Sequence, residues 1–254
     1  MRRSAGLWNF ATYPSVTPMQ RRMRLSRSAL RQTAGKQWRL SARPEAEKTT
    51  LVSLIARFYD ATSGQVLVDG QDVRDYSFEA LYNRIGYVTQ TPVLFSDTVR
   101  GNVCFGESAA AETDAEVKAA LALAQALEFV DKLPEKEDSR ITQGGTNVSG
   151  GQKQRLSIAR ALARRPEILI FDDSFSALDY QTDARLRAGL AQQLKDTTCL
   201  IVAQRIGTIR NADRIIVLDE GRAVGIGTHE QLMENCEVYR EIALSQLSAE
   251  ELGA

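Results

Sequence analysis

The chain has 254 residues, of which 43% are hydrophobic and 25% are charged, as is usual for a globular protein with one large core. No stretch approaches the roughly 18 consecutive apolar residues of a membrane-spanning helix, and the three scattered cysteines suggest neither a metal site nor a disulfide framework. The net charge is zero, but residues 1–44 hold ten Lys or Arg and no acid, which leaves 22 basic against 32 acidic residues in 45–254 and argues against a nucleic-acid-binding main body.

Residues 1–47 show no sustained strand or helix periodicity and are rich in arginine and small polar residues. We expect a disordered basic tail, since such a composition buries little apolar surface. An organellar transit peptide has a similar composition, but nothing else in the chain supports that interpretation. A third explanation, a shifted reading frame, follows from the motifs described below.

From Lys48 onward the pattern becomes regular. The elements expected in this part are a helix at 50–58, a strand at 65–68, a hairpin turn at Asp69-Gly70, a buried strand at 85–89 ending at Gln90, and an amphipathic helix at 114–130.

The stretch 147–179 reads NVSGGQKQRLSIARALARRPEILIFDDSFSALD. Ser149, Gly150, Gly151 and Gln152 stand directly before a helical run, whose first backbone N–H groups lack partners within the helix. Because these donors and the positive end of the helix dipole point the same way, we expect an anion-binding helix start.

After Pro166, the run Ile168–Phe171 is continuously apolar, as in buried parallel strands, and it ends in Asp172-Asp173. Two carboxylates at the end of a buried strand are costly unless a cation or protons neutralise them.

The remaining expected elements are a helix at 179–195, buried strands at 198–202 and 214–218, a hairpin at Glu220-Gly221, and two helices from about 228. The alternation of strands and helices predicts a mainly parallel sheet, and the region from about 93 to 163 reads as an inserted helical lobe.

These motifs closely resemble those of the ATP-binding domain of ABC transporters. Val148–Gln152 resembles the signature sequence, Ile168–Asp173 the Walker B strand, and Ser176–Asp179 the D-loop. The resemblance covers roughly 48–248 and implies an α/β fold, with a P-loop NTPase (RecA-like) core, a mainly parallel sheet and an inserted α-helical lobe. The N-terminal antiparallel part and the phosphate loop are expected to be degraded, and residues 48–254 to form the domain.

The resemblance implies ATP and Mg²⁺ as cofactors. Lys48 would contact the β- and γ-phosphates, Thr49 would place its hydroxyl on Mg²⁺ with Thr50 beside it, Gln90 would be the Q-loop glutamine, and Asp172 would hold Mg²⁺. The alternatives are ordinary structural roles: a helix start, a polar residue capping a strand, and a satisfied buried carboxylate.

The phosphate loop departs from the family pattern, because Ala42, Glu45 and Glu47 replace its three glycines. When residues 37–47 are back-translated and read one base earlier, the genetic code permits Ala-Val-Ala-Leu-Val-Gly-Pro-Ser-Gly-Gly-Gly before Lys48. That is a strand and phosphate loop of the ABC type. We therefore hypothesise that residues 1 to about 47 come from a shifted frame and that the chain is a truncated copy.

Two further departures concern catalysis. Asp173 replaces the family's catalytic glutamate, and Gln204 replaces its switch histidine, while the only histidine, His229, is expected at a helix N-terminus. Both losses resemble the degenerate subunit of heterodimeric ABC exporters, in which each ATP site takes its signature from the other chain. The intact signature would then complete the partner's site, and Asp179 would couple the two sites.

Residues 143–146 look like the exporter X-loop, which touches the membrane domain. The expected partners are a second ATP-binding domain packed head to tail and an exporter's transmembrane domain, with no nucleic acid. The expected location is cytoplasmic, at the inner face of the membrane. The alternative is a non-catalytic interaction remnant that binds no ATP through its own loop. A soluble cassette acting in translation or DNA repair is disfavoured by the X-loop and by the lack of tandem cassettes.

Overall fold

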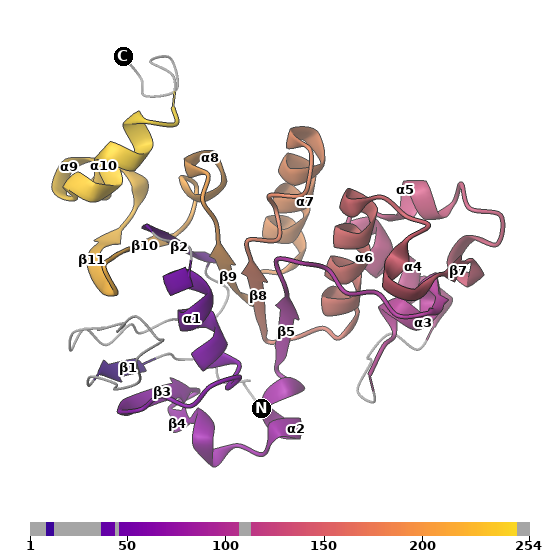
Figure 1. Cartoon of the computed structure of the whole chain (residues 1–254), viewed down its shortest axis with the longest axis horizontal. Helices are drawn as coiled ribbons and strands as arrows, with labels where there is room; N and C mark the ends of the chain where they lie inside the picture. The colour runs from indigo at the N-terminus through magenta and orange to yellow at the C-terminus, as the bar shows by residue number, and fades with distance from the viewer. Residues whose placement is uncertain (1–8, 13–36, 44–45, 107–112, 248–254) are drawn as a thin grey trace. The chain divides into compact units, whose positions relative to one another are not determined.

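The computed structural model describes residues 9–12, 37–43, 46–106 and 113–247. The chain divides into two compact units, one comprising 1–82 with 196–254 and the other comprising 83–195 (Figure 1).

The first unit contains a sheet built around β2 (Gln37–Arg43). This strand pairs in parallel with β9 (Thr198–Val202) on one side and with β10 (Arg214–Asp219) on the other, and β10 pairs antiparallel with β11 (Arg222–Gly227). All five residues of β9 are buried, as a continuous apolar run predicts.

A second sheet in the same unit is antiparallel, with the order β1 (Asn9–Thr12), β3 (Gly64–Val68) and β4 (Gln71–Asp72). The helices of this unit are α1 (Ala46–Ile55), a 3₁₀ turn η1 (Val73–Asp75), α2 (Phe78–Tyr82), α8 (Ile206–Ile209), α9 (His229–Asn235) and α10 (Glu237–Leu244).

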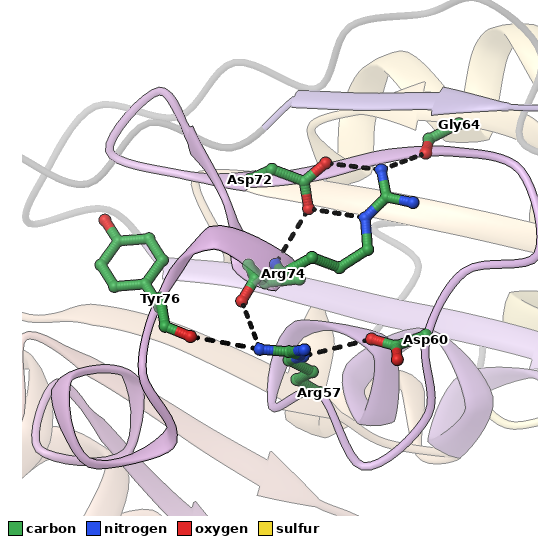
Figure 2. A network of polar contacts seen from close by, with 7 residues as sticks. Arg57, Asp60, Gly64, Asp72, Arg74 and Tyr76 are labelled. Atoms are coloured by element: carbon green, nitrogen blue, oxygen red, sulfur yellow. Dashed lines mark hydrogen bonds and ion pairs between the residues drawn. The ribbon is translucent and has the colours of Figure 1, made fainter.

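Two arginines tie the chain around β4 together (Figure 2). Arg74 Nη2 donates to Asp72 Oδ2 at 2.7 Å and to the Gly64 carbonyl at 3.1 Å. Arg57 Nη1 donates to the Tyr76 carbonyl at 3.1 Å. Arg74 thereby connects the 3₁₀ turn η1 to the first residue of β3, and Arg57 connects the chain after α1 to the residue that follows η1.

The second unit pairs β5 (Ile85–Val88) in parallel with β8 (Ile168–Asp172), with Tyr87 opposite Ile170 in the register. A short antiparallel pair joins β6 (Asp97–Thr98) and β7 (Arg140–Ile141). The helices are α3 (Val99–Val103), α4 (Asp114–Leu123), α5 (Leu127–Val130), the 3₁₀ turns η2 (Lys136–Asp138) and η3 (Gln143–Gly145), α6 (Gly150–Ala163) and α7 (Tyr180–Gln193).

The core of the second unit follows the predicted apolar periodicity of α6, where Leu156, Ile158 and Ala159 are fully buried. The single helix predicted at 114–130 is wrong, because α4 ends at Leu123 and α5 starts at Leu127. Gln125 between them has a φ of 57°, a left-handed conformation that stops an α-helix.

The segment 1–47 was expected to lack ordered structure, yet its described stretches 9–12 and 37–43 are strands. β2 alternates polar and apolar residues, with Trp38, Leu40 and Ala42 at every second position, and the sequence analysis overlooked this short strand pattern within the basic segment. The strand partners of both stretches lie far along the chain.

Positions 44 and 45 of the predicted phosphate loop lie outside the described residues. None of the described helices combines the length and the apolar character that crossing a membrane requires.

Candidate functional site

The carboxyl ends of β5 and β8 bring together three of the predicted site residues. Gln90 Nε2 donates to Asp173 Oδ2 at 3.3 Å, and Asp172 is the last residue of β8, with 4% of its surface exposed. The two residues of the Gln90–Asp173 pair lie 83 positions apart in sequence. Ends of neighbouring parallel strands are where α/β proteins commonly bind ligands.

A hydroxyl that the sequence analysis missed also lies here. The Tyr87 phenol donates to Asp172 Oδ2 at 2.9 Å. Its only indication in the sequence is a tyrosine in the middle of a strand that is predicted to be buried. That position does not tell which carboxylate the phenol meets.

The backbone after β8 turns sharply. Asp173 has a φ of 46°, in the left-handed region that few non-glycine residues adopt. The fully buried Ser174 hydroxyl donates to the Val88 carbonyl at 2.9 Å, which ties this turn to the end of β5. The turn therefore holds the Asp173 side chain where Gln90 reaches it.

Helix α6 contributes a further buried polar side chain, Gln154, which sequence reasoning also missed. Its Nε2 donates to the Thr89 carbonyl at 3.3 Å, directly before Gln90, and the whole residue is buried. Its position between the predicted signature and the apolar helix face made it look like part of a solvated surface. Through this contact α6 supports the backbone directly before Gln90.

The predicted anion-binding helix start is formed by α6. Ser149 is the N-cap, with its hydroxyl accepting from the Gln152 N–H at 3.3 Å and the Gln152 Oε1 accepting from the Ser149 N–H at 2.9 Å. This capping box fixes the helix start. A Cβ added at Gly150 would meet nothing within 4 Å, and one at Gly151 would meet the Ala177 carbonyl at 3.5 Å. The glycine at 150 is thus not required by packing within this chain.

Asp179 is the N-cap of α7, where its carboxylate accepts from the Thr182 N–H at 2.9 Å and from the Thr182 hydroxyl at 2.7 Å. These hydrogen bonds hold the pKa of the exposed Asp179 carboxyl below its usual value. The residue therefore has a helix-capping role whatever its role toward a partner.

The remaining predicted site residues belong to the first unit. Lys48 lies in the first turn of α1, and Thr49 and Thr50 follow it as exposed residues. Ala42 lies in β2.

Gln204 is exposed after β9, and its carbonyl accepts from Gln246 Nε2 at 3.0 Å. The oxygen of the same Gln246 side chain accepts from the Ile206 N–H at 2.8 Å. One side chain therefore hydrogen-bonds to the backbone on both sides of Arg205. His229 begins α9, as predicted, and its Nδ1 lies 2.8 Å from the Tyr239 hydroxyl.

Among the described residues, no three His, Cys, Asp or Glu side chains gather as a potential metal site. The pair Asp172 and Asp173 still suits Mg²⁺, which favours oxygen ligands and is commonly held by one or two carboxylates together with substrate phosphates.

Comparison with known proteins gives one family: the family model described as ABC transporter matches residues 26–176. This match starts before Lys48, so the expectation that residues up to 47 lie wholly outside the resemblance is wrong. The chain is 50% identical over 200 residues to an uncharacterized ABC transporter ATP-binding protein of Mycobacterium tuberculosis (strain ATCC 25618 / H37Rv), covering 78% of this chain and 34% of that protein.

It is also 44% identical over 206 residues to an ATP-dependent lipid A-core flippase of Syntrophus aciditrophicus (strain SB), covering 81% of this chain and 34% of the flippase. A solved structure, of a bacterial Atm1-family ABC exporter with ATP bound, superposes with a TM-score of 0.89 at 32% identity, covering 98% of this chain and 43% of that one. The chain thus spans about a third of the length of the curated relatives it matches.

Proposed function

Since this chain belongs to the ABC transporter family, we propose that it acts as the ATP-binding domain of an exporter. In this role it couples ATP binding and hydrolysis to export through a transmembrane partner, at the cytoplasmic face of the membrane. The observation that carries the proposal is the Gln90–Asp173 contact beside Asp172 at the ends of β5 and β8. The similarity to exporter sequences and to an exporter structure supports the same assignment.

In this proposal each of the predicted site residues has its own role toward Mg²⁺ or ATP. Asp172, Gln90 and the Thr49 hydroxyl would hold the metal directly or through water. Lys48 would neutralise phosphate charge, with Thr50 next to Thr49 in sequence. When bound, Mg²⁺ would supply positive charge that offsets the charge of the phosphates. Asp173 would orient water as the general base, and Gln204 would donate a hydrogen bond to the γ-phosphate.

The same site has features that slow hydrolysis. Asp173 is one methylene shorter than glutamate, and a general base must come within about 2.6–3.2 Å of its proton, directly or through one water. Gln204 cannot titrate as a histidine does. Glu45 and Glu47 put negative side chains where glycines would let backbone approach a polyanion. We therefore assign this chain the degenerate site of a heterodimer.

The signature of this chain would then serve the partner's nucleotide. The open space over Gly150 and the capped start of α6 leave room for an outside anion there. Head-to-tail packing with a second ATP-binding domain places Ser149–Gln152 against the partner's triphosphate, and Asp179 couples the two sites.

This assignment predicts an asymmetric effect on the ATPase rate of the assembled exporter. Ser149→Arg is expected to abolish the activity, while Asp173→Ala is expected to change it by less than about twofold, because only the partner's site turns over rapidly. Equal losses from both substitutions would overturn the heterodimer model.

Gly150→Asp separates loss of function from loss of fold. The Cβ of an aspartate at 150 would meet none of the described residues within 4 Å, and its charge suits the N-terminal end of the helix dipole. The melting temperature should therefore be unchanged, while repulsion of the partner's phosphate should remove activity.

The second candidate function, a non-enzymatic interaction protein that docks onto an intact partner, is favoured by Glu45 and Glu47 at glycine positions. Titration of the full chain with ATP decides between them. Micromolar binding that is lost in Lys48→Ala supports the ATP-binding role, and absence of binding together with retained partner docking supports the alternative.

The shifted-frame hypothesis is tested at the level of DNA. Genomic reads across the codons for residues 37–48 should contain one extra base, with a reading frame for a membrane domain upstream. An in-frame sequence without the extra base would refute it.

A further inference from the structure

The hydrogen bond from Tyr87 to Asp172 joins two residues 85 positions apart, at 2.9 Å between the phenol oxygen and Oδ2. Asp172 is buried, and a buried carboxylate is stable only when donors or cations satisfy its oxygens. A hydroxyl donating to an ionised carboxylate makes one of the stronger neutral-to-charged hydrogen bonds. The phenol therefore restrains how the Asp172 carboxylate is turned.

The backbone explains how Tyr87 reaches this carboxylate. Tyr87 lies opposite Ile170 in the parallel register of β5 and β8, so Asp172 lies two residues further along the neighbouring strand. The long phenol spans this offset, whereas an aliphatic side chain at 87 would offer no donor. Half-burial of the ring keeps its orientation defined.

We propose that Tyr87 is a positioning residue for Mg²⁺, fixing the orientation in which Asp172 meets the metal. This inference rests on the proposed function, in which Asp172 holds Mg²⁺. Tyr87 does not touch the metal or the nucleotide in this account, so its effect passes through the carboxylate alone.

The test compares Tyr87→Phe with Tyr76→Phe in the full chain. Both substitutions keep the ring and remove the hydroxyl. The Tyr76 hydroxyl donates to the Val68 carbonyl at 2.9 Å instead of to a carboxylate, and Tyr76 is not part of the proposed site. Both substitutions should lower the melting temperature slightly, and only Tyr87→Phe should affect the metal.

Binding of a fluorescent ATP analogue is measured with Mg²⁺ and with EDTA, using the natural chain and the chain carrying Ala42→Gly, Glu45→Gly and Glu47→Gly. Mn²⁺ binding is followed in parallel by electron paramagnetic resonance. For Tyr87→Phe we expect the half-saturating Mg²⁺ and Mn²⁺ concentrations to rise about fivefold, equivalent to about 1 kcal/mol. Metal-free nucleotide affinity should stay unchanged.

The outcomes separate the inference from the proposed function. If nucleotide binds and the metal dependence of Tyr87→Phe equals that of the unsubstituted chain or of Tyr76→Phe, Tyr87 has no positioning role. If neither form of the chain binds nucleotide, the proposed ATP-binding function fails, and the Tyr87 inference fails with it.

Discussion

At the scale of single residues, Arg160 on α6 contacts two other chain segments and two aromatic rings. Its guanidinium donates to the Val93 carbonyl at 2.8 Å and to the backbone and side-chain oxygens of Asn102 at 2.7 and 2.8 Å, and it lies over the rings of Phe95 and Phe105. Burial lowers its pKa to about 10, which leaves it charged at neutral pH. Fixed donors and a flat face are properties of arginine that lysine lacks.

Arg160→Lys is therefore expected to destabilise the chain by about 2 kcal/mol, because buried oxygens of Asn102 lose their donors. Urea unfolding measures this change. Arg185→Lys, on an exposed position of α7, is the control and should change the unfolding free energy by less than about 0.5 kcal/mol. Equal effects of the two substitutions would show that the Arg160 contacts contribute no stability.

Asp72 makes a pH-dependent contribution to the free energy of unfolding. The hydrogen bonds from Arg74 hold the pKa of this buried carboxyl below its usual value. A carboxyl whose pKa is lower in the folded chain stabilises the fold above its unfolded pKa of about 3.9, and that contribution is lost as the pH falls through the folded pKa.

We expect Asp72→Asn to lower the unfolding free energy at pH 7 by about 1 kcal/mol. The difference between the two proteins should shrink steadily below about pH 4. Urea unfolding from pH 7 to pH 3 checks this, and a difference that stays constant over that range would contradict it.

At the scale of elements, the second unit depends on a close approach of β5 to the end of α6. A Cβ added at Gly86 in β5 would lie 2.9 Å from Leu169 Cδ1 and from Pro166 Cγ, and 3.1 Å from the Ala161 carbonyl. Backbone cannot yield as a flexible side chain does, so the strand and helix would have to separate. Helix α6 is thus held against β5, the strand that leads to Gln90.

Gly86→Ala is expected to cost about 1–3 kcal/mol through overpacking. Gly150→Ala, where a Cβ meets open space, should leave the unfolding free energy unchanged or slightly raised. Thermal unfolding of both variants tests the packing argument, which fails if Gly86→Ala melts at the temperature of the unsubstituted chain.

At the scale of the whole molecule, our proposal combines a signature at Ser149–Gln152 with a phosphate loop that has Ala42, Glu45 and Glu47 at its three glycine positions. Restoring them with Ala42→Gly, Glu45→Gly and Glu47→Gly should raise affinity for MgATP at least about tenfold, because two carboxylates leave the surroundings of a triphosphate. Isothermal titration measures the gain. Lys48→Ala in the restored chain should abolish it, and a gain that survives this substitution would place the nucleotide elsewhere.

The sequence alone determined the elements whose patterns are local. The capped start of α6, its apolar face and the buried run of β8 ending in two carboxylates all follow from residues within one turn or strand. The predicted Thr198–Val202 strand is present with the same bounds, and Asp179 caps the helix predicted from it. Local spacing is enough here because capping and burial periodicity act over a few residues.

Only the tertiary structure decided which side chains meet. The contacts Tyr87–Asp172, Gln90–Asp173 and Gln154–Thr89 join residues 85, 83 and 65 positions apart. The place of β2 between β9 and β10 was equally hidden, because the alternating pattern of its residues can indicate a strand but cannot indicate that strand's neighbours. Strand neighbours in a parallel sheet are set by crossover connections and packing of the whole unit, and no local pattern encodes them.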